Sequence, residues 1–281
     1  RLLAAALVGA ALAMGGAALQ GLLRNPLAEP YILGVSSGAG VGVLLGLAVS
    51  ARTALPDWAS TPALAFAGAL ATCAVVYLIA QRRGRLDSYA LILSGVIVNA
   101  FNAAVMLAIF LYVDPYRIAD FVSWAMGRLE DTVEGARLAA SGACVLAGGA
   151  LLALRGPALN VLGLGDDVAA SSGVRVHRLR IEVFAAVGLM TAAAVSLAGP
   201  IGFLGLIVPH LCRMVAGPSH RRLLLLSAAA GAGLLIGADL LCRRVGPLLG
   251  AGVVPVGIVT ALAGGPFFLL LLRRRRGEGT L

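Results

Sequence analysis

The sequence predicts an all-α, polytopic membrane protein, and three observations carry that prediction. Of the 281 residues, 60% are hydrophobic and only 12% are charged, whereas a soluble domain carries about 25% charged residues. The apolar stretches approach the length of a bilayer-spanning helix,. They are also continuous rather than alternating, which disfavours a transmembrane β-barrel. A soluble enzyme, a disordered chain and a coiled coil are excluded, because none of them can carry this much apolar surface.

Nine segments are candidates for transmembrane helices, since a span needs about 20 mostly apolar residues. They are 2–23, 31–51, 62–80, 88–113, 138–154, 181–198, 201–216, 223–242 and 256–272. The sixth and seventh share one charge-free run, from Val183 to Cys212, that contains Gly199-Pro200 and Gly202. Proline breaks a helix by removing a backbone hydrogen bond and clashing with the preceding turn, so we expect two helices there. The whole chain, 1–281, is expected to be one transmembrane domain.

The distribution of arginine predicts the orientation. All 22 basic residues are arginine and the net charge is +9. Because they cluster between apolar runs, the positive-inside rule explains them, and no nucleic-acid partner is expected. If the spans alternate and Arg273–Arg276 are cytoplasmic, 15 arginines lie inside and 7 outside. The outer seven are Arg1, Arg52, Arg117, Arg128, Arg137, Arg243 and Arg244. The C-terminus is therefore expected inside, and a further span upstream would return the N-terminus to the cytoplasm.

Two polar connections are too long to be simple turns, and long ordered connections are usually functional. The outer one, 114–137, contains Trp124, which favours a short helix at headgroup depth,. The inner one, 155–180, contains Asp166 and Asp167 followed by basic residues.

Four glycines, Gly34, Gly38, Gly42 and Gly46, recur at every fourth residue and would line one face of a helix,. One interpretation is helix packing within the subunit, which small residues allow. The other is a slim helix beside a transport path.

Asp239 is the one acidic residue well inside an expected span. It is either functional, as buried membrane carboxylates usually are, or paired with Arg243 four residues on, the alternative that we favour. His210 stands alone, without metal-ligand spacing, and the four cysteines form no C-x-x-C pair,. No metal or cofactor is therefore expected.

The chain also lacks a G-x-x-x-x-G-K-[ST] motif, so it cannot hold ATP phosphates in that way,. It has no intramembrane acidic pair suited to a proton relay. A transporter of this kind must take its energy from a partner.

Three stretches resemble the BtuC/FecCD family of membrane subunits of type II ABC importers for cobalamin, ferric siderophores and haem. They are Gly16–Gly46 (GAALQGLLRNPLAEPYILGVSSGAGVGVLLG), Ala198–Arg222 (AGPIGFLGLIVPHLCRMVAGPSHRR) and Pro255–Leu270 (PVGIVTALAGGPFFLL). The family motif positions within them are Asn25, Pro26, Pro30, Pro209 and His210. The likeness extends over essentially the whole chain.

The resemblance implies a fold of about ten helices, of which this chain lacks the first. It also implies a location in the bacterial inner membrane and contact with membrane lipid. The implied partners are a second permease copy, two cytoplasmic ATPase subunits and an external substrate-binding protein. The implied cargo is a metal chelate of the iron-siderophore type, with cobalamin and haem as alternatives within the family. An ion-coupled secondary transporter is the more distant alternative, and an intramembrane enzyme would need a nucleophile–base pair that the spans do not show.

The resemblance further implies that the inner connection folds into two short coupling helices, over Leu159–Val174, that contact the ATPase. Asp166 fits an N-cap or first-turn position there. The residues assigned to this coupling loop are Leu162, Gly163, Leu164, Gly165, Asp166, Asp167, Ala169, Ser172 and Gly173.

The family's cytoplasmic gate aligns with Asp87, Ser88 and Tyr89, where an acid and an aromatic replace small polar residues. Arg243 matches an outer arginine that pairs with acids of the binding protein. The insert Val245–Val254 beside it is longer than the family version.

Overall fold

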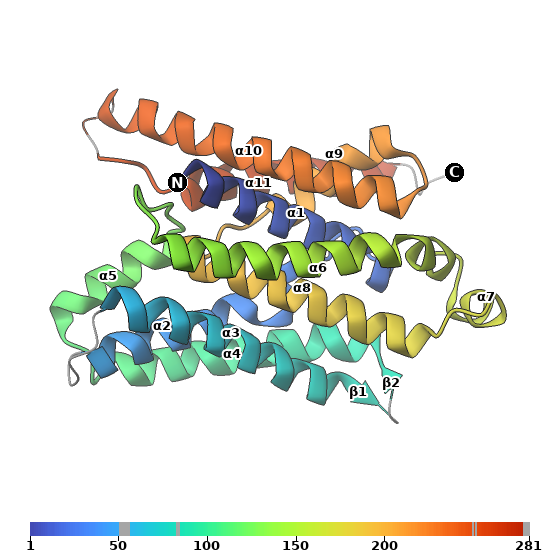
Figure 1. Ribbon diagram of the computed structural model, residues 1–281, viewed down its shortest axis with the longest axis horizontal. Coiled ribbons are helices and arrows are strands. Elements are labelled where there is room, and N and C mark those ends of the chain that lie inside the picture. Colours follow the sequence, from blue (N-terminus) through green and yellow to red (C-terminus); the bar gives the residue numbers. More distant parts are fainter. Residues whose placement is uncertain (51–56, 83–84, 249, 251, 278–281) are drawn as a thin grey trace.

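The computed structural model describes residues 1–50, 57–82, 85–248, 250 and 252–277, and in them the chain is helical apart from one small hairpin (Figure 1). This confirms the all-α prediction. The helices are α1 (Leu2–Leu23), the 3-10 turn η1 (Pro30–Leu33), α2 (Val35–Ser50), α3 (Asp57–Ala80), α4 (Ser88–Phe110), α5 (Pro115–Ala125), α6 (Gly135–Leu162), α7 (Asp166–Ser171), α8 (Val176–Ala198), α9 (Leu204–Ala216), α10 (His220–Leu248) and α11 (Val256–Gly277). The hairpin pairs β1 (Gln81–Arg82) with β2 (Arg85–Leu86) in antiparallel register.

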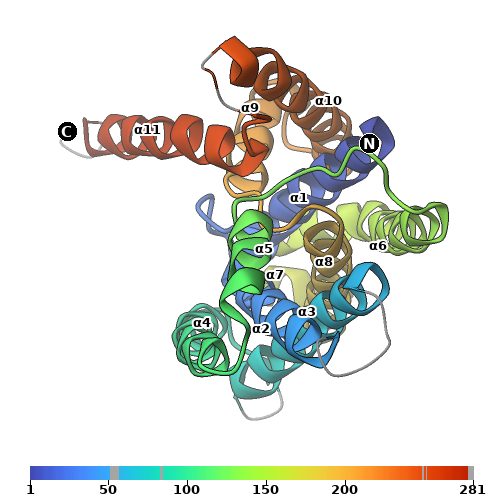
Figure 2. The same cartoon turned by 90° about the vertical axis from the view of Figure 1, so that its left-hand side faces the viewer.

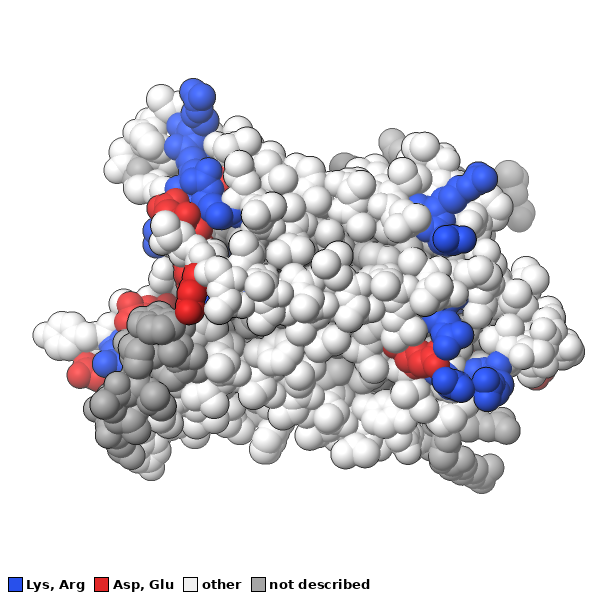
Figure 3. Space-filling model, in the orientation of Figure 1, with Lys and Arg blue, Asp and Glu red and all other residues white. Residues whose placement is uncertain are grey.

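The long helices run along the long axis of the molecule, and charged side chains gather at its two ends (Figures 1 and 3). We call these the α7 end and the α5 end. At the α7 end, Arg24 and Arg180 both form ion pairs with Asp166. At the α5 end, Arg1 and Arg243 both form ion pairs with Asp131. This separation matches the grouping expected from the sequence. Arg52 and Arg83 lie outside the described residues, as do the side chains of Arg82, Arg85 and Arg273–Arg276.

Six helices of the described chain are long and apolar enough to cross a bilayer: α1, the Thr61–Ala80 part of α3, α4, α6, α8 and α10. The expectation of nine full spans is not confirmed, since α2 and α9 are shorter and α11 was assessed only over Val256–Phe268, where its side chains are described. The 13 residues of α9 extend about 20 Å, against a hydrocarbon core of about 30 Å,. The shortfall arises because the chain leaves the helical conformation at Gly34, Gly199 and Phe203, all with positive φ.

Helices α1 and α8 form the centre of the bundle, with α3, α6, α9 and α10 around them (Figure 2). Their buried residues are mostly small, which lets neighbouring backbones approach closely,. Gly9 of α1 lies directly against the carbonyl of Gly231 in α10, where an added Cβ has no room. The break that was expected at Gly199-Pro200 is confirmed, since α8 ends at Ala198 and α9 begins at Leu204.

The glycine stripe packs α2 against α3. Cβ atoms added at Gly38 and Gly42 would collide with backbone of α3, at Gly68 and Leu64 respectively, and one at Gly46 would touch Thr61. These contacts support helix packing within the subunit, the first of the two interpretations. Gly34 does not belong to the helical stripe, because its φ of 76° ends η1 before α2 begins.

The segment between α1 and α2 folds back against the middle of the bundle. Pro30 packs on Gly15 of α1 and Gly205 of α9. The Tyr31 hydroxyl accepts a hydrogen bond from the Ile201 N–H (2.8 Å) and donates to the Ile201 carbonyl (3.2 Å). This connection is therefore a packed element as well as a turn.

The short helix expected within 114–137 is present as α5. Its N-cap, Asp114, accepts from the Tyr116 N–H, and Pro115 occupies the first turn, where a missing N–H costs nothing,. Trp124 lies one residue from the end of α5 and stacks at a tilt on Phe121.

Candidate coupling site and outer charge cluster

Helix α7 is a short helix with two acids in its first turn. Gly165 precedes it with a φ of 128°, and Asp166 and Asp167 follow. Carboxylates here complement the positive end of the helix dipole. The predicted first-turn position of Asp166 is confirmed.

The connection between α6 and α8, where the coupling loop was expected, is shorter than 155–180 and contains one short helix, not two. Arg155 to Leu162 continue α6 through Pro157, and α8 already begins at Val176. The helix continues past Pro157, although proline has no N–H to donate to the preceding turn,. The implied pair of helices over Leu159–Val174 is therefore wrong for the described chain.

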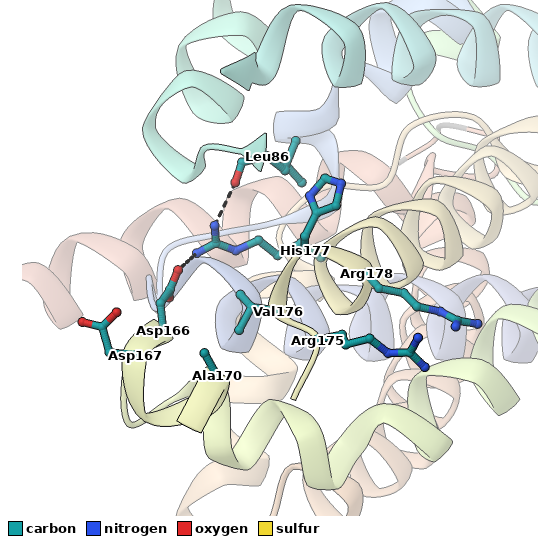
Figure 4. Close-up of a pocket in the computed structure, with 9 residues that line it drawn as sticks. Leu86, Asp166, Asp167, Ala170, Arg175, Val176, His177 and Arg178 are labelled. Atoms are coloured by element: carbon teal, nitrogen blue, oxygen red, sulfur yellow. Dashed lines mark hydrogen bonds and ion pairs between the residues drawn. The ribbon is translucent and has the colours of Figure 1, made fainter. Parts of the chain in front are cut away.

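Asp166 joins three parts of the α7 end. Its Oδ1 atom lies 2.6 Å from Nη2 of Arg24, which follows α1, and its Oδ2 atom lies 2.7 Å from Nη2 of Arg180 in α8. Arg180 also donates through Nη1 to the carbonyl of Leu86 in β2, at 2.8 Å (Figure 4). We call Arg24, Asp166, Arg180 and Leu86 the Asp166 junction. It links α7 to α1, to α8 and to the hairpin.

A cavity of about 490 Å³ opens beside this junction, between α7, β2 and the start of α8. Asp167 and Ala170 line its α7 side and Val176 lines its α8 side (Figure 4). Among the other predicted loop residues, Leu162 and Ala169 are buried and hold α7 in place. Gly163 ends α6, and Leu164, Ser172 and Gly173 are exposed. The α7 end thus offers a shaped, partly charged surface.

The three predicted gate residues lie directly after the hairpin, at the start of α4. Asp87 is the N-cap, and its Oδ1 accepts from the Ala90 N–H at 2.7 Å. Ser88 begins the helix and Tyr89 is 76% exposed. Leu86 belongs to the Asp166 junction, and Asp87 follows it directly in the chain.

At the α5 end, Arg243 sits in a four-residue charge cluster. Its Nη1 lies 2.6 Å from Oδ1 of Asp131, and its Nε lies 3.4 Å from Oδ1 of Asp239. Arg1 pairs with the same two acids, at 3.4 and 3.0 Å. The predicted Asp239–Arg243 pair is confirmed. The Arg243 guanidinium lowers the pKa of the exposed Asp131 carboxyl below its ordinary value.

Two of the expected family motif residues, Asn25 and His210, make local contacts within the bundle. Asn25 Oδ1 accepts from the Leu27 N–H at 2.9 Å and so fixes the turn that begins at Pro26. Pro209 and His210 lie within α9, where the His210 ring meets the edge of Phe267 at 6.0 Å between centroids. Among the described residues, no three His, Cys, Asp or Glu side chains gather as metal ligands.

Comparison with known proteins identifies the family of this arrangement. The model of the FecCD transport family matches residues 1–274. The chain belongs to the FecCD transport family. It is a permease, the membrane subunit of a type II ABC importer. In these importers a separate ATPase hydrolyses ATP.

Individual FecCD relatives are similar in sequence to this chain along nearly its full length. The cobalamin import system permease protein BtuC of Halobacterium salinarum is 44% identical over 279 residues, which cover 98% of this chain and 72% of that protein. The hemin transport system permease protein HmuU of Yersinia pestis is 38% identical over 280 residues, which cover 99% of this chain and 82% of that protein. A solved ABC transporter of the metal-chelate type, in an inward-facing conformation, has a TM-score of 0.86 at 30% identity, covering 98% of this chain and 85% of its own.

Sequence reasoning missed both partners of Asp166, and at the α5 end it found the Asp239–Arg243 pair but missed Asp131 and Arg1. Arg24 and Arg180 lie 142 and 14 residues from Asp166, and no periodicity connects them. The one available signal was that Arg24 directly precedes the Asn25-Pro26 motif.

Proposed function

We propose that this permease forms, with a second copy of itself, the path by which a metal chelate of the iron-siderophore type crosses the cytoplasmic membrane. Two ATPase subunits bind at the α7 end, which faces the cytoplasm together with the C-terminus. A substrate-binding protein docks at the α5 end. The 15 to 7 division of arginines supports this orientation,.

The Asp166 junction is the observation that carries the proposal. An ATPase that moves α7 must also move whatever Asp166 holds, and Asp166 holds α1 through Arg24 and α8 through Arg180. Through Leu86 the same motion reaches the start of α4, where Asp87, Ser88 and Tyr89 form the proposed gate. ATP binding and substrate release can then bias one two-state element from opposite ends.

Docking at the α5 end is proposed to use Arg243. Its guanidinium already pairs with the exposed Asp131, so an acid of the binding protein would take the place of Asp131. Arg243 then still faces a carboxylate, and Asp131 keeps its ion pair with Arg1, so the exchange leaves neither charge unpaired,.

Cobalamin is the second candidate substrate, and the 44% identity to a cobalamin permease favours it. Haem is the third, by the likeness to the hemin permease. All three are large metal chelates, the class named for the solved structural relative.

The test is reconstitution of the permease in vesicles with its ATPase and binding protein, followed by uptake of a ferric siderophore, cyanocobalamin or haemin. We expect uptake to require ATP and all three components. Asp166→Leu and Gly165→Leu should uncouple ATP hydrolysis from uptake in a folded protein, since Gly165 has a φ that L side chains rarely adopt. Normal uptake in both variants would contradict the coupling role, and uptake by the permease alone along an ion gradient would favour a secondary transporter.

A further inference from the structure

We infer that a pocket between α6 and α8 at the α7 end binds the phosphate headgroup of an anionic phospholipid. The pocket has a volume of about 270 Å³ and is lined by residues of α6, of the segment Gly173–Arg175 and of the first turns of α8. Its charged side chains are Arg155 of α6, Arg175 before α8, and Arg178 and Glu182 of α8. Arg175 and Arg178 also line the cavity beside the Asp166 junction, but the ion pairs of the junction itself are made by Arg24 and Arg180.

Three arginines surround one carboxylate in this pocket. Glu182 accepts a hydrogen bond from Nη2 of Arg155 at 3.0 Å and one from Nε of Arg178 at 2.8 Å, so two arginines share one carboxylate. Arg175 is exposed, and its side chain points to the same side of α8 as that of Arg178, away from Asp166 (Figure 4). The pocket therefore keeps a net charge of about two positive units, counted from fully ionised side chains.

The N-terminus of α8 adds to this positive potential. The first N–H groups of a helix have no intrahelical partner and carry the positive end of its dipole. Here the N-cap is Arg175, whose side chain accepts nothing, and the first turn contains no acid. A phosphate is the type of group that such a helix start holds well.

The pocket lies at one end of an apolar strip of the right length for a lipid. Arg155 and Arg137 are 18 residues apart in α6, which is five full turns and about 27 Å, so they share one face at nearly the hydrocarbon thickness of a bilayer,. Cys144 and Ser141 line this face near Arg137. The surface of α6 next to this face is apolar and exposed at Ala140, Ala147 and Leu154, and Leu154 is 74% exposed. Acyl chains would lie along this surface.

The depth of the site favours a lipid over a soluble anion or an ATPase side chain. Arg155 lies seven residues before the end of α6, about 10 Å back from its last residue toward the bilayer,. Its neighbour Leu154 is exposed on the helix shaft. Basic pockets between transmembrane helices at this depth suit anionic headgroups.

The experiment measures lipid binding to the purified full-length chain in detergent by native mass spectrometry, with phosphatidylglycerol and phosphatidylcholine as probes. Arg175→Gln should weaken phosphatidylglycerol binding about fivefold, the effect of one arginine at a membrane surface. Glu182→Gln should strengthen it by a similar factor, because it removes the competing carboxylate. Arg222→Gln, an exposed arginine at the same end but outside the pocket, is the matched control and should change nothing.

The opposite signs of the two variants separate binding from misfolding, since a damaged protein would not gain affinity. Equal retention of both lipids by wild type, or no change in either variant, would overturn the proposal. Displacement of phosphatidylglycerol by millimolar inorganic phosphate would identify a site for free anions and would also overturn it. So would loss of ATPase co-purification in Arg175→Gln with lipid binding unchanged, because the arginine would then serve the ATPase.

Discussion

Asp166 and Arg180 are joined by an ion pair of 2.7 Å, and the same guanidinium holds the Leu86 carbonyl at 2.8 Å. One side chain of α8 thus connects the first turn of α7 to the strand that precedes α4. The side chain of Arg180 is only 13% exposed and that of Asp166 is 39% exposed, so water competes with the ion pair mainly at the carboxylate of Asp166. The pair contributes about 1 kcal/mol or less to stability, and its importance lies in the connection that it makes.

Breaking this connection should separate ATP hydrolysis from transport. Asp166→Asn and Arg180→Gln are each expected to reduce uptake about tenfold, within the usual range of coupling between sites, while ATPase activity stays within about twofold of wild type. Arg180→Lys should be intermediate, because an ammonium cannot serve both acceptors with the geometry of a guanidinium. The measurement is uptake and phosphate release in the same vesicles.

Asp167→Asn is the control for these variants, since Asp167 occupies the same turn of α7 but takes part in neither ion pair of the junction. A transport defect in this control as large as that of Asp166→Asn would show that charge on α7, and not the junction, is what matters.

The Asp131–Arg243 pair predicts a pH dependence at the α5 end. Arg243 lowers the pKa of Asp131 in the folded protein, so the pair stabilises the fold fully above the ordinary carboxyl value of about 3.9. That contribution is lost as the pH falls through the lower, folded value. The difference in Tm between wild type and Asp131→Asn should therefore be constant above about pH 5 and should vanish in stronger acid.

Asp120→Asn, a surface acid outside this cluster, should show no such pH-dependent difference. If the two variants follow the same curve, general surface charge rather than the Arg243 contact controls the acid response.

The contact between α2 and α3 should not tolerate added volume. Gly42→Ala places a methyl group against the Leu64 carbonyl and should lower the free energy of unfolding by about 1–3 kcal/mol, the usual cost of overpacking. Gly233→Ala in α10 meets nothing within 4 Å and should be neutral or slightly stabilising. Thermal unfolding in detergent measures both, and equal stabilities would contradict the packing described for α2.

The Tyr31 hydroxyl should stabilise the contact of η1 with the loop before α9. Tyr31→Phe removes both hydrogen bonds to Ile201 and should cost about 0.5–1.5 kcal/mol. Tyr116→Phe changes a hydroxyl on a residue that is 90% exposed and should cost nothing measurable. The midpoints of unfolding in denaturant compare the two variants. A midpoint of Tyr31→Phe equal to that of wild type would mean that water replaces both hydrogen bonds.

Composition and hydropathy were sufficient to predict the class of fold, the α8–α9 break and the division of arginines between the two ends. The expected count of nine full spans is not confirmed, and hydropathy does not register the backbone breaks that shorten α2 and α9, at the positive φ of Gly34 and Phe203. Apolar residues on either side of a break read as one continuous span.

The candidate site was predictable only within one segment of chain. The acids of α7 follow from helix-start chemistry, as does the Asp239–Arg243 pair from its spacing of four. Arg24 and Asp131 could not be found in this way, since their partners are more than 100 residues away. Such contacts depend on how the helices pack, and local patterns contain no information about that.

The contact between Gly9 and Gly231 has a consequence for biosynthesis. About 220 residues separate the two glycines, so α1 leaves the ribosome long before its neighbour α10 exists. Until then the nascent α1 must remain in lipid or beside an insertion factor with its glycine face uncovered. The contacts of α1 with α6 and α8 can form earlier, but its contact with α10 can close only when translation is almost finished.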